Sequence, residues 1–293
     1  MTMKNPLSRR EAIAVIGSAA VGAVAGASTA SAVSAIKSAT ESGAVSAVPF
    51  FGAHQAGIET PSQSHVTFVA FDMHAETSKS DVAKLLRLWT QDMSLLANGK
   101  PATGDPAPEN AVNAANLTFT VGFGYSLFSK VGMTSRWPFD MTSIPSYSID
   151  KLEEQWSDGD VIVQICCDDA LTLSHAVREV IRGAQPFSNV RWTQQGFGLQ
   201  KGGKPQPRNL MGQIDGTGNP RLGSQVFAES VWAGKGVEGW FDGGTSLVLR
   251  RIAMQLDTWE MLTPEAQEEV IGRKRSNGAP LTGNVEREMP DLL

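Results

Sequence analysis

The stretch His65-Val66-Thr67-Phe68-Val69-Ala70-Phe71-Asp72 decides how the rest of the chain is interpreted. Its apolar and polar residues alternate, and a period of two is typical of a β-strand with one buried face. Apolar residues then recur at helical spacing from Ser80 to Leu96, and Ser80 is the expected N-cap of that helix. The folded part of the chain is therefore predicted to begin with a strand and a helix.

The segments that follow extend this pattern. Further strands are expected at 117–123, 160–167 and 190–198, and a further helix at 170–182. The order strand, helix, strand, strand, helix, strand is that of a ferredoxin-like unit, so the predicted fold class is α+β. A second unit is predicted to start with a strand at 246–255 and a helix at 264–273. The residues after that helix resemble a loop, so we expect this second unit to be incomplete, with an unpaired sheet edge.

These segments divide the chain into four parts. We expect a signal peptide at 1–32, a flexible linker at 33–49, a first ferredoxin-like unit at 50–200, and a loop with a partial second unit at 201–293.

The first part has the features of an export signal. Arg9 and Arg10 precede a moderately apolar run, and Ala30-Ser31-Ala32 is a plausible cleavage site. Paired arginines in this position are typical of a twin-arginine signal, which predicts a periplasmic or extracellular protein. An uncleaved N-terminal anchor is the alternative, although the run is short and rich in glycine and alanine for a membrane span.

Charge and cysteine content exclude some classes of protein. The chain carries a net charge of −5 and the expected leader carries +2, so the remainder carries −7. It contains no basic block, and we therefore expect no nucleic-acid partner. The two cysteines, Cys166 and Cys167, are adjacent in an expected strand. Neighbouring residues of a strand point to opposite faces, so we expect buried free thiols without a disulfide.

One loop contains a charged residue in an unusual setting. Asp215 lies between Gly212 and Gly216 in the stretch 207–220, which is otherwise apolar or small, with Arg208 and Arg221 as the nearest cations in sequence. If the loop is buried, Asp215 is poorly solvated, and such groups cluster at functional sites. The alternative is an ordinary turn, because Asp-Gly and Gly-Asn-Pro are common turn sequences.

Several motifs together resemble the dye-decolourising peroxidases. The Gly212–Gly216 stretch resembles the family's Gly-x-x-Asp-Gly motif, and 51–58 resembles its opening Gly-x-His-Gln-Ala-Gly-Ile. The segment Thr120-Val121-Gly122-Phe123-Gly124 and the stretch 250–273 match further motifs. The resemblance extends from about Phe50 to the end of the chain and implies a ferredoxin-like fold of the dimeric α+β barrel type.

The resemblance also implies a function. It predicts an enzyme that binds haem b, reduces hydrogen peroxide and oxidises dyes or other bulky organic reductants. Asp215 is the distal acid-base that moves a proton between the two peroxide oxygens. A carboxylate works where a histidine would be protonated, so an acidic optimum is expected. Gly216, Thr217 and Asn219 are candidate contacts to the haem edge, and turn capping is the alternative for Thr217 and Asn219. Self-association into a homo-oligomer is also expected.

The histidines do not complete this site. The family ligates iron through a proximal histidine in the second unit, with an arginine on the distal side. The chain has four histidines, His54, His65, His74 and His175, and none matches that position. His54 lies in the opening motif, and His175 is interpreted as a satisfied helix residue. We therefore expect no metal ligand in this chain and a form that is truncated before the proximal histidine.

Three interpretations remain open at this point. The first is an exported haem peroxidase, with Trp and Tyr residues as potential electron relays, although core packing is expected for Trp89, Trp156 and Trp259. A close variant is the subgroup described as deferrochelatases, which release iron from haem. The other two are a non-catalytic haem-binding or porphyrin-binding remnant and a partial gene product without function.

Overall fold

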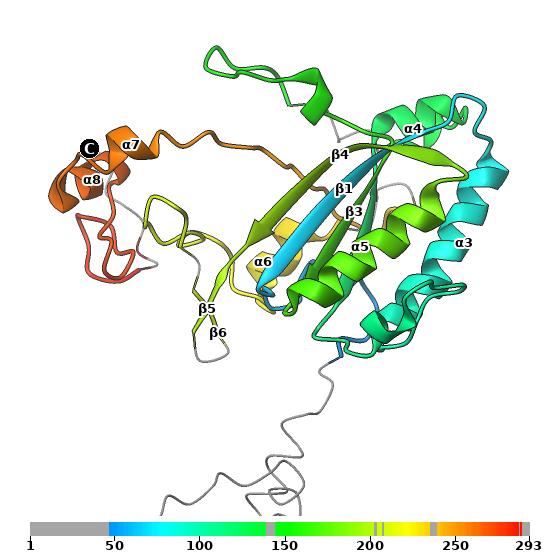
Figure 1. Ribbon diagram of the computed structural model, residues 1–293. Coiled ribbons are helices and arrows are strands. Elements are labelled where there is room, and N and C mark those ends of the chain that lie inside the picture. Colours follow the sequence, from blue (N-terminus) through cyan, green and yellow to red (C-terminus); the bar gives the residue numbers. More distant parts are fainter. Residues whose placement is uncertain are drawn as a thin grey trace, which may run out of the picture. The chain divides into compact units, whose positions relative to one another are not determined.

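Four antiparallel strands form the main sheet of the computed structural model (Figure 1). The structure describes residues 47–138, 144–201, 204–206, 208–234, 239–286 and 288. The strands are β1 (His65–Met73), β2 (Thr118–Phe123), β3 (Val161–Cys167) and β4 (Ser188–Phe197). Their order in the sheet is β2-β3-β1-β4, so the two central strands, β3 and β1, are not consecutive in the sequence. With its two helices this is the predicted ferredoxin-like α+β unit, which is confirmed.

Alternation of side chains explains how the sheet buries one face. Val161, Val163, Ile165 and Cys167 are all buried on β3, and the residues between them are only half-buried. Successive side chains of a strand point to opposite faces, so this pattern places one row of β3 in the core. The register of β1 with β4 shifts between Ala70 and Phe71, which marks a β-bulge in this otherwise regular pairing.

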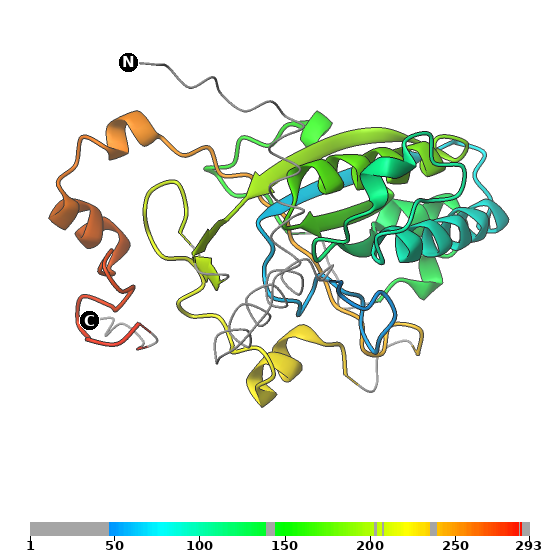
Figure 2. The same cartoon turned by 60° about the horizontal axis from the view of Figure 1, so that its bottom comes forward.

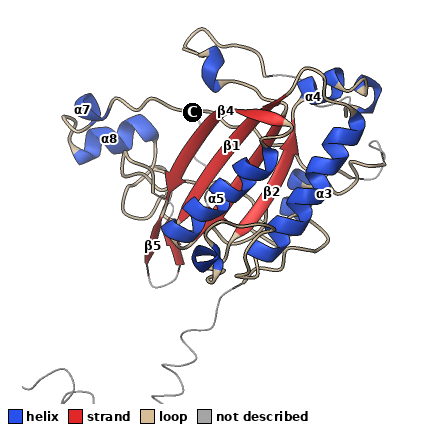
Figure 3. Ribbon diagram, turned by 45° about the vertical axis from the view of Figure 1, so that its right-hand side comes forward, coloured by secondary structure: helices blue, strands red, loops and turns tan. Residues whose placement is uncertain are grey.

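Two helices, α3 (Lys79–Leu96) and α5 (Ala170–Ala184), cover the same face of the sheet (Figure 3). Trp89 on α3 is buried, packs against Phe71 of β1, and donates a hydrogen bond through Nε1 to the carbonyl of Val180 on α5 at 3.0 Å. A buried indole N–H usually finds such a partner. This contact fixes α3 against α5 above the sheet.

The start of α3 differs from the prediction by two residues. Ser78, and not Ser80, is the N-cap, and its side chain accepts from the backbone N–H of Asp81. Asp81 in turn accepts from the backbone of Ser78, so the pair forms a capping box. Ser78 was not predicted as the N-cap because Ser80 is the same residue type. Only the reciprocal hydrogen bonds with Asp81 distinguish the two serines.

Short elements connect the main strands. They are η1 (Pro108–Ala111), α4 (Tyr125–Lys130), η2 (Thr134–Arg136) and η3 (Glu154–Trp156). Lys130 at the end of α4 pairs with the buried Asp160, which also accepts from the backbone N–H of Met73 at 2.7 Å. This ion pair ties the end of α4 to the beginning of β3 and the end of β1. Cys166 and Cys167 are free thiols, as predicted.

After β4 the chain runs on into a small hairpin (Figure 2). The hairpin consists of β5 (Leu199–Lys201) and β6 (Lys204–Gln206), which pair antiparallel. The later helices are α6 (Gln225–Val231), α7 (Leu256–Trp259) and α8 (Pro264–Ile271). Helix α8 confirms the predicted second helix, and it ends at Gly272, which takes the left-handed conformation that favours glycine at a helix C-terminus.

The predicted strand at 246–255 is wrong. This segment is not hydrogen-bonded into either sheet. Its arginines instead contact η3 and the loop before it: Arg250 pairs with Asp150 in the loop, and the Arg251 guanidinium lies 4.5 Å from the ring centroid of Trp156 in η3. Apolar residues in this run satisfied the strand pattern, but a strand also needs a neighbour that can share its backbone hydrogen bonds. The expected partial second ferredoxin-like unit is therefore represented by helices without a sheet.

Packing predictions for the three tryptophans had different outcomes. Trp89 and Trp259 are buried, as predicted, but the side chain of Trp156 is 40% exposed. Its contact with Arg251 is a surface cation–π pair, so the core assignment of Trp156 is wrong.

The expected leader at 1–32 and most of the expected linker lie outside the described residues. Residues Val45–Leu293 form one unit by their internal contacts. Within the described part of the chain, no helix combines the length and the apolar character that crossing a bilayer requires.

Candidate functional site

The loop that carries Asp215 folds back on itself immediately after β6. Arg208 and Ile214 form an antiparallel bridge, and the backbone N–H of Asn209 donates to the carbonyl of Gln213 at 3.0 Å. Gly212, at the tip, has a φ of +81°, a conformation that residues with a Cβ rarely adopt. The chain reverses here, and Asp215 follows directly after the reversal.

Asn209 organises this loop through both ends of its side-chain amide. Its Oδ1 accepts from the backbone N–H groups of Met211 at 3.0 Å and Gln213 at 3.2 Å. Its Nδ2 donates to Asp215 Oδ1 at 3.1 Å. The same side chain therefore closes the turn and orients the carboxylate. This role of Asn209 was not predicted from the sequence, although the tendency of asparagine to bond its own backbone two residues on was a usable signal.

Asp215 is exposed, so the burial that would leave its carboxylate poorly solvated is not found in the described chain. Its one hydrogen bond there is the bond from Asn209. Arg208, the nearest cation before Asp215 in the sequence, donates instead to the carbonyls of Gly212 and Arg275, both at 2.8 Å. The second carboxylate oxygen, Oδ2, thus remains available to an incoming molecule.

Helices α7 and α8 support the Asp215 loop through a chain of hydrogen bonds. Trp259 donates through Nε1 to the carbonyl of Met211 at 3.0 Å, and its own carbonyl accepts from Gln267 at 2.8 Å. Gln267 then accepts from the Arg275 guanidinium at 2.7 Å. Trp259 and Gln267 are buried, so this chain of hydrogen bonds lies beneath the loop and away from solvent. Gln267 and Arg275 were not predicted to support this loop, because nothing in their local sequence links them to a segment about fifty residues earlier.

The predicted haem-edge residues form a second turn after Asp215. Gly216 has a φ of +73°, and its carbonyl accepts from the backbone N–H of Asn219 at 3.0 Å. Thr217 is half-buried, and its methyl group lies against Gly278, where an added Cβ would come within 2.9 Å of it. These are the contacts of a well-packed turn. Haem contacts from Gly216, Thr217 and Asn219 stay predictions.

One buried polar atom near Asp215 has no partner. Gln213 is buried, and its Nε2 is the single fully covered side-chain nitrogen or oxygen without a hydrogen bond in the part of the chain that the structure describes. Leaving a buried donor unpaired costs about 1–3 kcal/mol. This amide, two residues before Asp215, is therefore a place where a further group would stabilise the site.

The histidines lie on other elements. The His54 ring stacks on Trp232 with centroids 3.6 Å apart, and Nδ1 lies 3.0 Å from the carbonyl of Gly243. His65 begins β1, and the backbone of His74 bonds Phe187 after that strand ends. His175 on α5 is buried and bonds Asp105, which agrees with its interpretation as a satisfied helix residue. In the described ranges, no histidine hydrogen bond or ring contact reaches the 208–219 loop.

Comparison with protein families gives two adjacent matches. Residues 55–198 match the family described as "Dyp-type peroxidase, N-terminal" and residues 206–291 match "Dyp-type peroxidase, C-terminal". The first match contains the ferredoxin-like unit, and the second contains the Asp215 loop with α7 and α8.

Individual relatives agree with these matches. A deferrochelatase of Shigella flexneri serotype 5b is 33% identical over 261 residues, which cover 83% of this chain and 62% of that protein. A dye-decolorizing peroxidase of Thermobifida fusca is 35% identical over 250 residues, which cover 80% of this chain and 58% of that protein. The chain thus spans about three fifths of the length of these curated relatives.

Solved structures show the same relationship. The crystal structure of a DyP-type peroxidase from Cellulomonas bogoriensis is similar with a TM-score of 0.79 and 44% identity, over 85% of this chain and 69% of that one. Ferric DtpA from Streptomyces lividans follows with a TM-score of 0.78 and 40% identity, over 84% and 68%. By its two family matches and these relatives, the chain belongs to the Dyp-type peroxidase family.

Proposed function

We propose that the protein is a haem-dependent peroxidase that reduces hydrogen peroxide and oxidises a dye or another bulky organic reductant. The observation that carries this proposal is the Asp215 carboxylate, which lies exposed in the region matched to the family's C-terminal domain and is oriented by Asn209. Family membership supplies the reaction class, and the loop geometry supplies a group able to perform its proton transfer.

The residues around Asp215 fit one side of a haem group. Gly218 has nothing within 4 Å of the position that a Cβ would occupy, so a flat ligand can approach the backbone there. Gln213 Nε2 is an unpaired donor beside the loop, which an acceptor would satisfy. None of the histidines in the described residues contacts this loop, and none is therefore assigned as a haem ligand. The fit therefore concerns the distal side only.

Haem, when bound, supplies the redox-active iron. The protein's own part is the movement of a proton. Asp215 accepts a proton from one oxygen of hydrogen peroxide and returns it to the other, so that the O–O bond breaks and the twice-protonated oxygen leaves as water. The second oxygen would leave as water once the organic reductant has supplied two electrons and solvent two protons. Oδ1 accepts from Asn209 and leaves Oδ2 to exchange the proton. A carboxylate stays ionised at pH values where an imidazole is protonated, which supports an acidic optimum.

The test compares two exposed aspartates. The purified chain is loaded with haem b, its Soret band is recorded, and turnover of hydrogen peroxide with an anthraquinone dye is measured between pH 3 and 8. Asp215→Asn is expected to lower kcat at least about 100-fold, since general acid–base groups contribute that much or more. Asp257→Asn, an exposed aspartate of α7, is the matched control and should change kcat less than about twofold.

Two results would contradict this proposal. Unchanged dye oxidation in Asp215→Asn removes Asp215 from the mechanism. A chain that binds haem with a ligated Soret band but never turns over peroxide favours the non-catalytic haem-binding alternative.

A deferrochelatase role is the second candidate, because the Shigella flexneri protein at 33% identity is named for it. Iron release from haem leaves an intact porphyrin, whereas dye oxidation leaves the haem in place. Porphyrin fluorescence and chelated iron, measured on the haem-loaded chain under reducing conditions, separate the two activities. Porphyrin accumulation without dye turnover would replace peroxidase by deferrochelatase.

Export is part of the same proposal. The paired arginines Arg9 and Arg10 and the apolar run after them support a twin-arginine route to the periplasm or the medium. Replacing both arginines by lysine should retain the protein inside the cell and leave the precursor uncleaved. Normal export of that variant would contradict the assignment. Self-association remains an expectation, and size-exclusion chromatography with light scattering tests it.

A further inference from the structure

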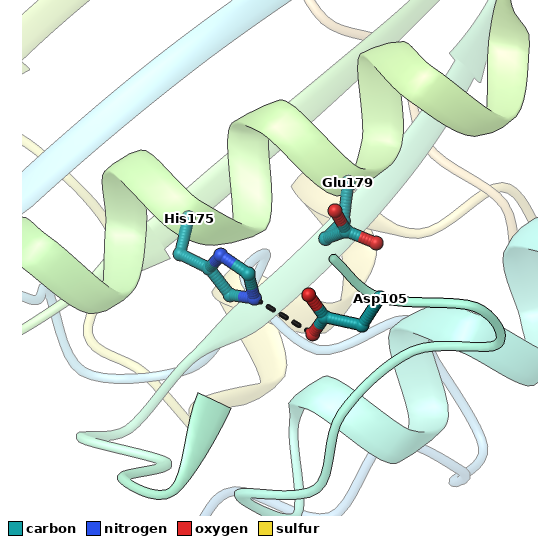
Figure 4. A group of neighbouring side chains, drawn as sticks. All are labelled: Asp105, His175 and Glu179. Atoms are coloured by element: carbon teal, nitrogen blue, oxygen red, sulfur yellow. Dashed lines mark hydrogen bonds and ion pairs between the residues drawn. The ribbon is translucent and has the colours of Figure 1, made fainter. Parts of the chain in front are cut away.

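A second cluster of ionisable side chains lies under helix α5, within the ferredoxin-like unit. His175 and Glu179 are one turn apart on α5, and Asp105 faces them from the loop after α3 (Figure 4). One ligand atom of each residue lies within 4.8 Å of those of the other two. Residues at i and i+4 share a helix face, so the helix itself sets the spacing of His175 and Glu179.

All three side chains are shielded from solvent. The exposed fraction of the side chain is 1% for Asp105, 7% for His175 and 3% for Glu179. The Nε2 atom of His175 lies 2.9 Å from Asp105 Oδ2, and Asp105 Oδ1 accepts from the backbone N–H of Ala107 at 2.8 Å. Burying a carboxylate is costly unless a cation or several donors compensate its charge.

Carboxylates outnumber guanidinium groups around this cluster. Arg182, one turn after Glu179, pairs with it and also donates to the carbonyl of Thr103. Asp92 on α3 is buried close by and accepts from the backbone N–H of Thr103 at 3.0 Å. The Glu179 hydrogen bond, against the opposing effect of burial, raises the pKa of Arg182, and the charges of Glu179, Asp105 and Asp92 add to it. The carboxylates of Glu179, Asp105 and Asp92 thus all interact electrostatically with the single guanidinium of Arg182.

We propose that Asp105, His175 and Glu179 bind a divalent zinc ion. One imidazole nitrogen and two carboxylate oxygens are zinc ligands, and three protein ligands leave a fourth position for water. Zinc would replace the hydrogen bond between His175 Nε2 and Asp105 Oδ2, and both atoms would become its ligands. Bound zinc would fix the loop that carries Asp105 to α5.

The rearrangement that zinc requires is small. Bonds of 2.0–2.2 Å in a tetrahedral site place neighbouring ligand atoms about 3.4 Å apart. The three atoms therefore need to close by only part of their present separation. Arg182 must release one oxygen of Glu179, and its side chain is 39% exposed, so the guanidinium can turn to water. The site shares no residue with the 208–219 loop and does not depend on the proposed peroxidase function.

Cys166 and Cys167 are alternative zinc ligands elsewhere in the chain. Burial raises the pKa of both Cys166 and Cys167 to about 11, so the thiols stay protonated near neutral pH. Cobalt distinguishes the two kinds of site, because a thiolate ligand adds an intense sulfur-to-cobalt charge-transfer band that imidazole and carboxylate ligands lack.

The experiment titrates the full chain, without an affinity tag, with zinc sulfate by calorimetry at pH 7.5. One equivalent of zinc is expected to bind, and the heat of each injection gives the stoichiometry and the affinity. His175→Gln and Glu179→Gln should each weaken binding roughly 100-fold, whereas His74→Gln and Glu76→Gln, a histidine and a glutamate away from the cluster, should bind as the parent does. The haem spectrum should be the same in all five proteins.

Three outcomes would overturn the proposal. They are no stoichiometric binding by the parent chain, parental affinity in both cluster variants, and a cobalt complex with a sulfur charge-transfer band. Where a cluster variant does not fold, the parent's cobalt spectrum and the remaining variant decide the question. If the parent chain binds no zinc, Asp105, His175, Glu179 and Arg182 form a structural ion-pair network only.

Discussion

The side-chain amide of Asn209 donates to the carboxylate of Asp215 at 3.1 Å, and the same amide closes the turn that precedes it. The amide oxygen accepts from two backbone N–H groups, and the amide nitrogen donates to the carboxylate. One residue therefore couples the shape of the loop to the direction of its acid, and the two contributions can be separated by substitution.

Asn209→Asp tests the orienting contribution. An aspartate keeps the acceptor oxygens for the N–H groups of Met211 and Gln213 but loses the donor to Asp215 and adds a like charge. We expect stability within about 0.5 kcal/mol of the parent chain. Turnover of the haem-loaded chain should fall roughly tenfold, which corresponds to about 1.4 kcal/mol in the barrier. Asn209→Ala, which removes both contributions, should lower stability as well by about 1 kcal/mol. Parental turnover in Asn209→Asp would show that Asn209 only shapes the turn.

Gly278 is expected to be sensitive to any side chain. It has a φ of +72°, and a Cβ there would lie 2.9 Å from Thr217 Cγ2 and 3.2 Å from Glu286 Cγ. Gly278→Ala should lower the free energy of unfolding by about 2 kcal/mol, because backbone strain and a steric clash add together. Gly272→Ala is the matched control: its φ is +78°, but nothing lies within 4 Å of the new Cβ. It should cost about 1 kcal/mol from backbone strain alone. Urea unfolding measures both, and equal losses would exclude the proposed clash with Thr217.

The Asp160–Lys130 pair predicts a pH-dependent contribution to stability. Burial alone would raise the pKa of Asp160, but hydrogen bonds from Lys130, Ser126 and the Met73 backbone, together with the charge of Lys130, hold it below its usual value. A lowered folded pKa means that the stabilisation is complete above the unfolded value near 3.9 and is lost as the pH falls through the folded pKa.

Asp160→Asn should therefore lower stability at pH 7 by about 3 kcal/mol, since Lys130 loses its carboxylate and keeps only the carbonyl of Met73. The difference from the parent chain should shrink below about pH 4. Denaturant unfolding between pH 3 and 8 measures it, with the exposed Asp257→Asn as the control. A difference that stays constant over this range would contradict the ionised pair.

The two thiols are expected to be unreactive in the folded chain. Burial raises the pKa of Cys166 and Cys167 to about 11, and the thiolate is the species that attacks a disulfide reagent. At pH 8 the reaction with an aromatic disulfide should be at least roughly 100-fold slower in the folded chain than in guanidinium chloride. Both thiols should react in the denatured state, because neither forms a disulfide. Rapid reaction of one thiol in the native chain would show that its strand opens to solvent.

Predictions from sequence were most accurate where the period of the pattern and the packing agreed. Strand β1 and helix α5 begin at the predicted residues, because alternating and helical spacing each leave one apolar face that must be buried. The segment 246–255 had the same apolar character, but a strand exists only when a second segment accepts its backbone hydrogen bonds. Arg250 and Arg251 instead direct it to Asp150 and Trp156.

The candidate site was predictable in its central residue and not in its surroundings. Asp215 stood out because a charge between glycines is rare, and the loop was found without any knowledge of its contacts. Trp259, Gln267 and Arg275 lie about fifty residues or more away in sequence. The hydrogen bond from Trp259 to the loop, and those that link Trp259 to Gln267 and Gln267 to Arg275, follow from no local rule. The solvent exposure of Asp215 could not be predicted from the sequence either, because it depends on which segments pack around the loop.

The amino-acid sequence alone determined the ferredoxin-like order of elements, the free thiols and the position of the acid. These follow from periodicity, residue type and spacing along the chain. Only the tertiary structure decided that Asn209 orients Asp215, that Trp156 lies at the surface, and that Asp105 faces His175 and Glu179. The physical reason is that hydrogen bonds and burial depend on which segments meet in space, and separation along the chain does not specify that.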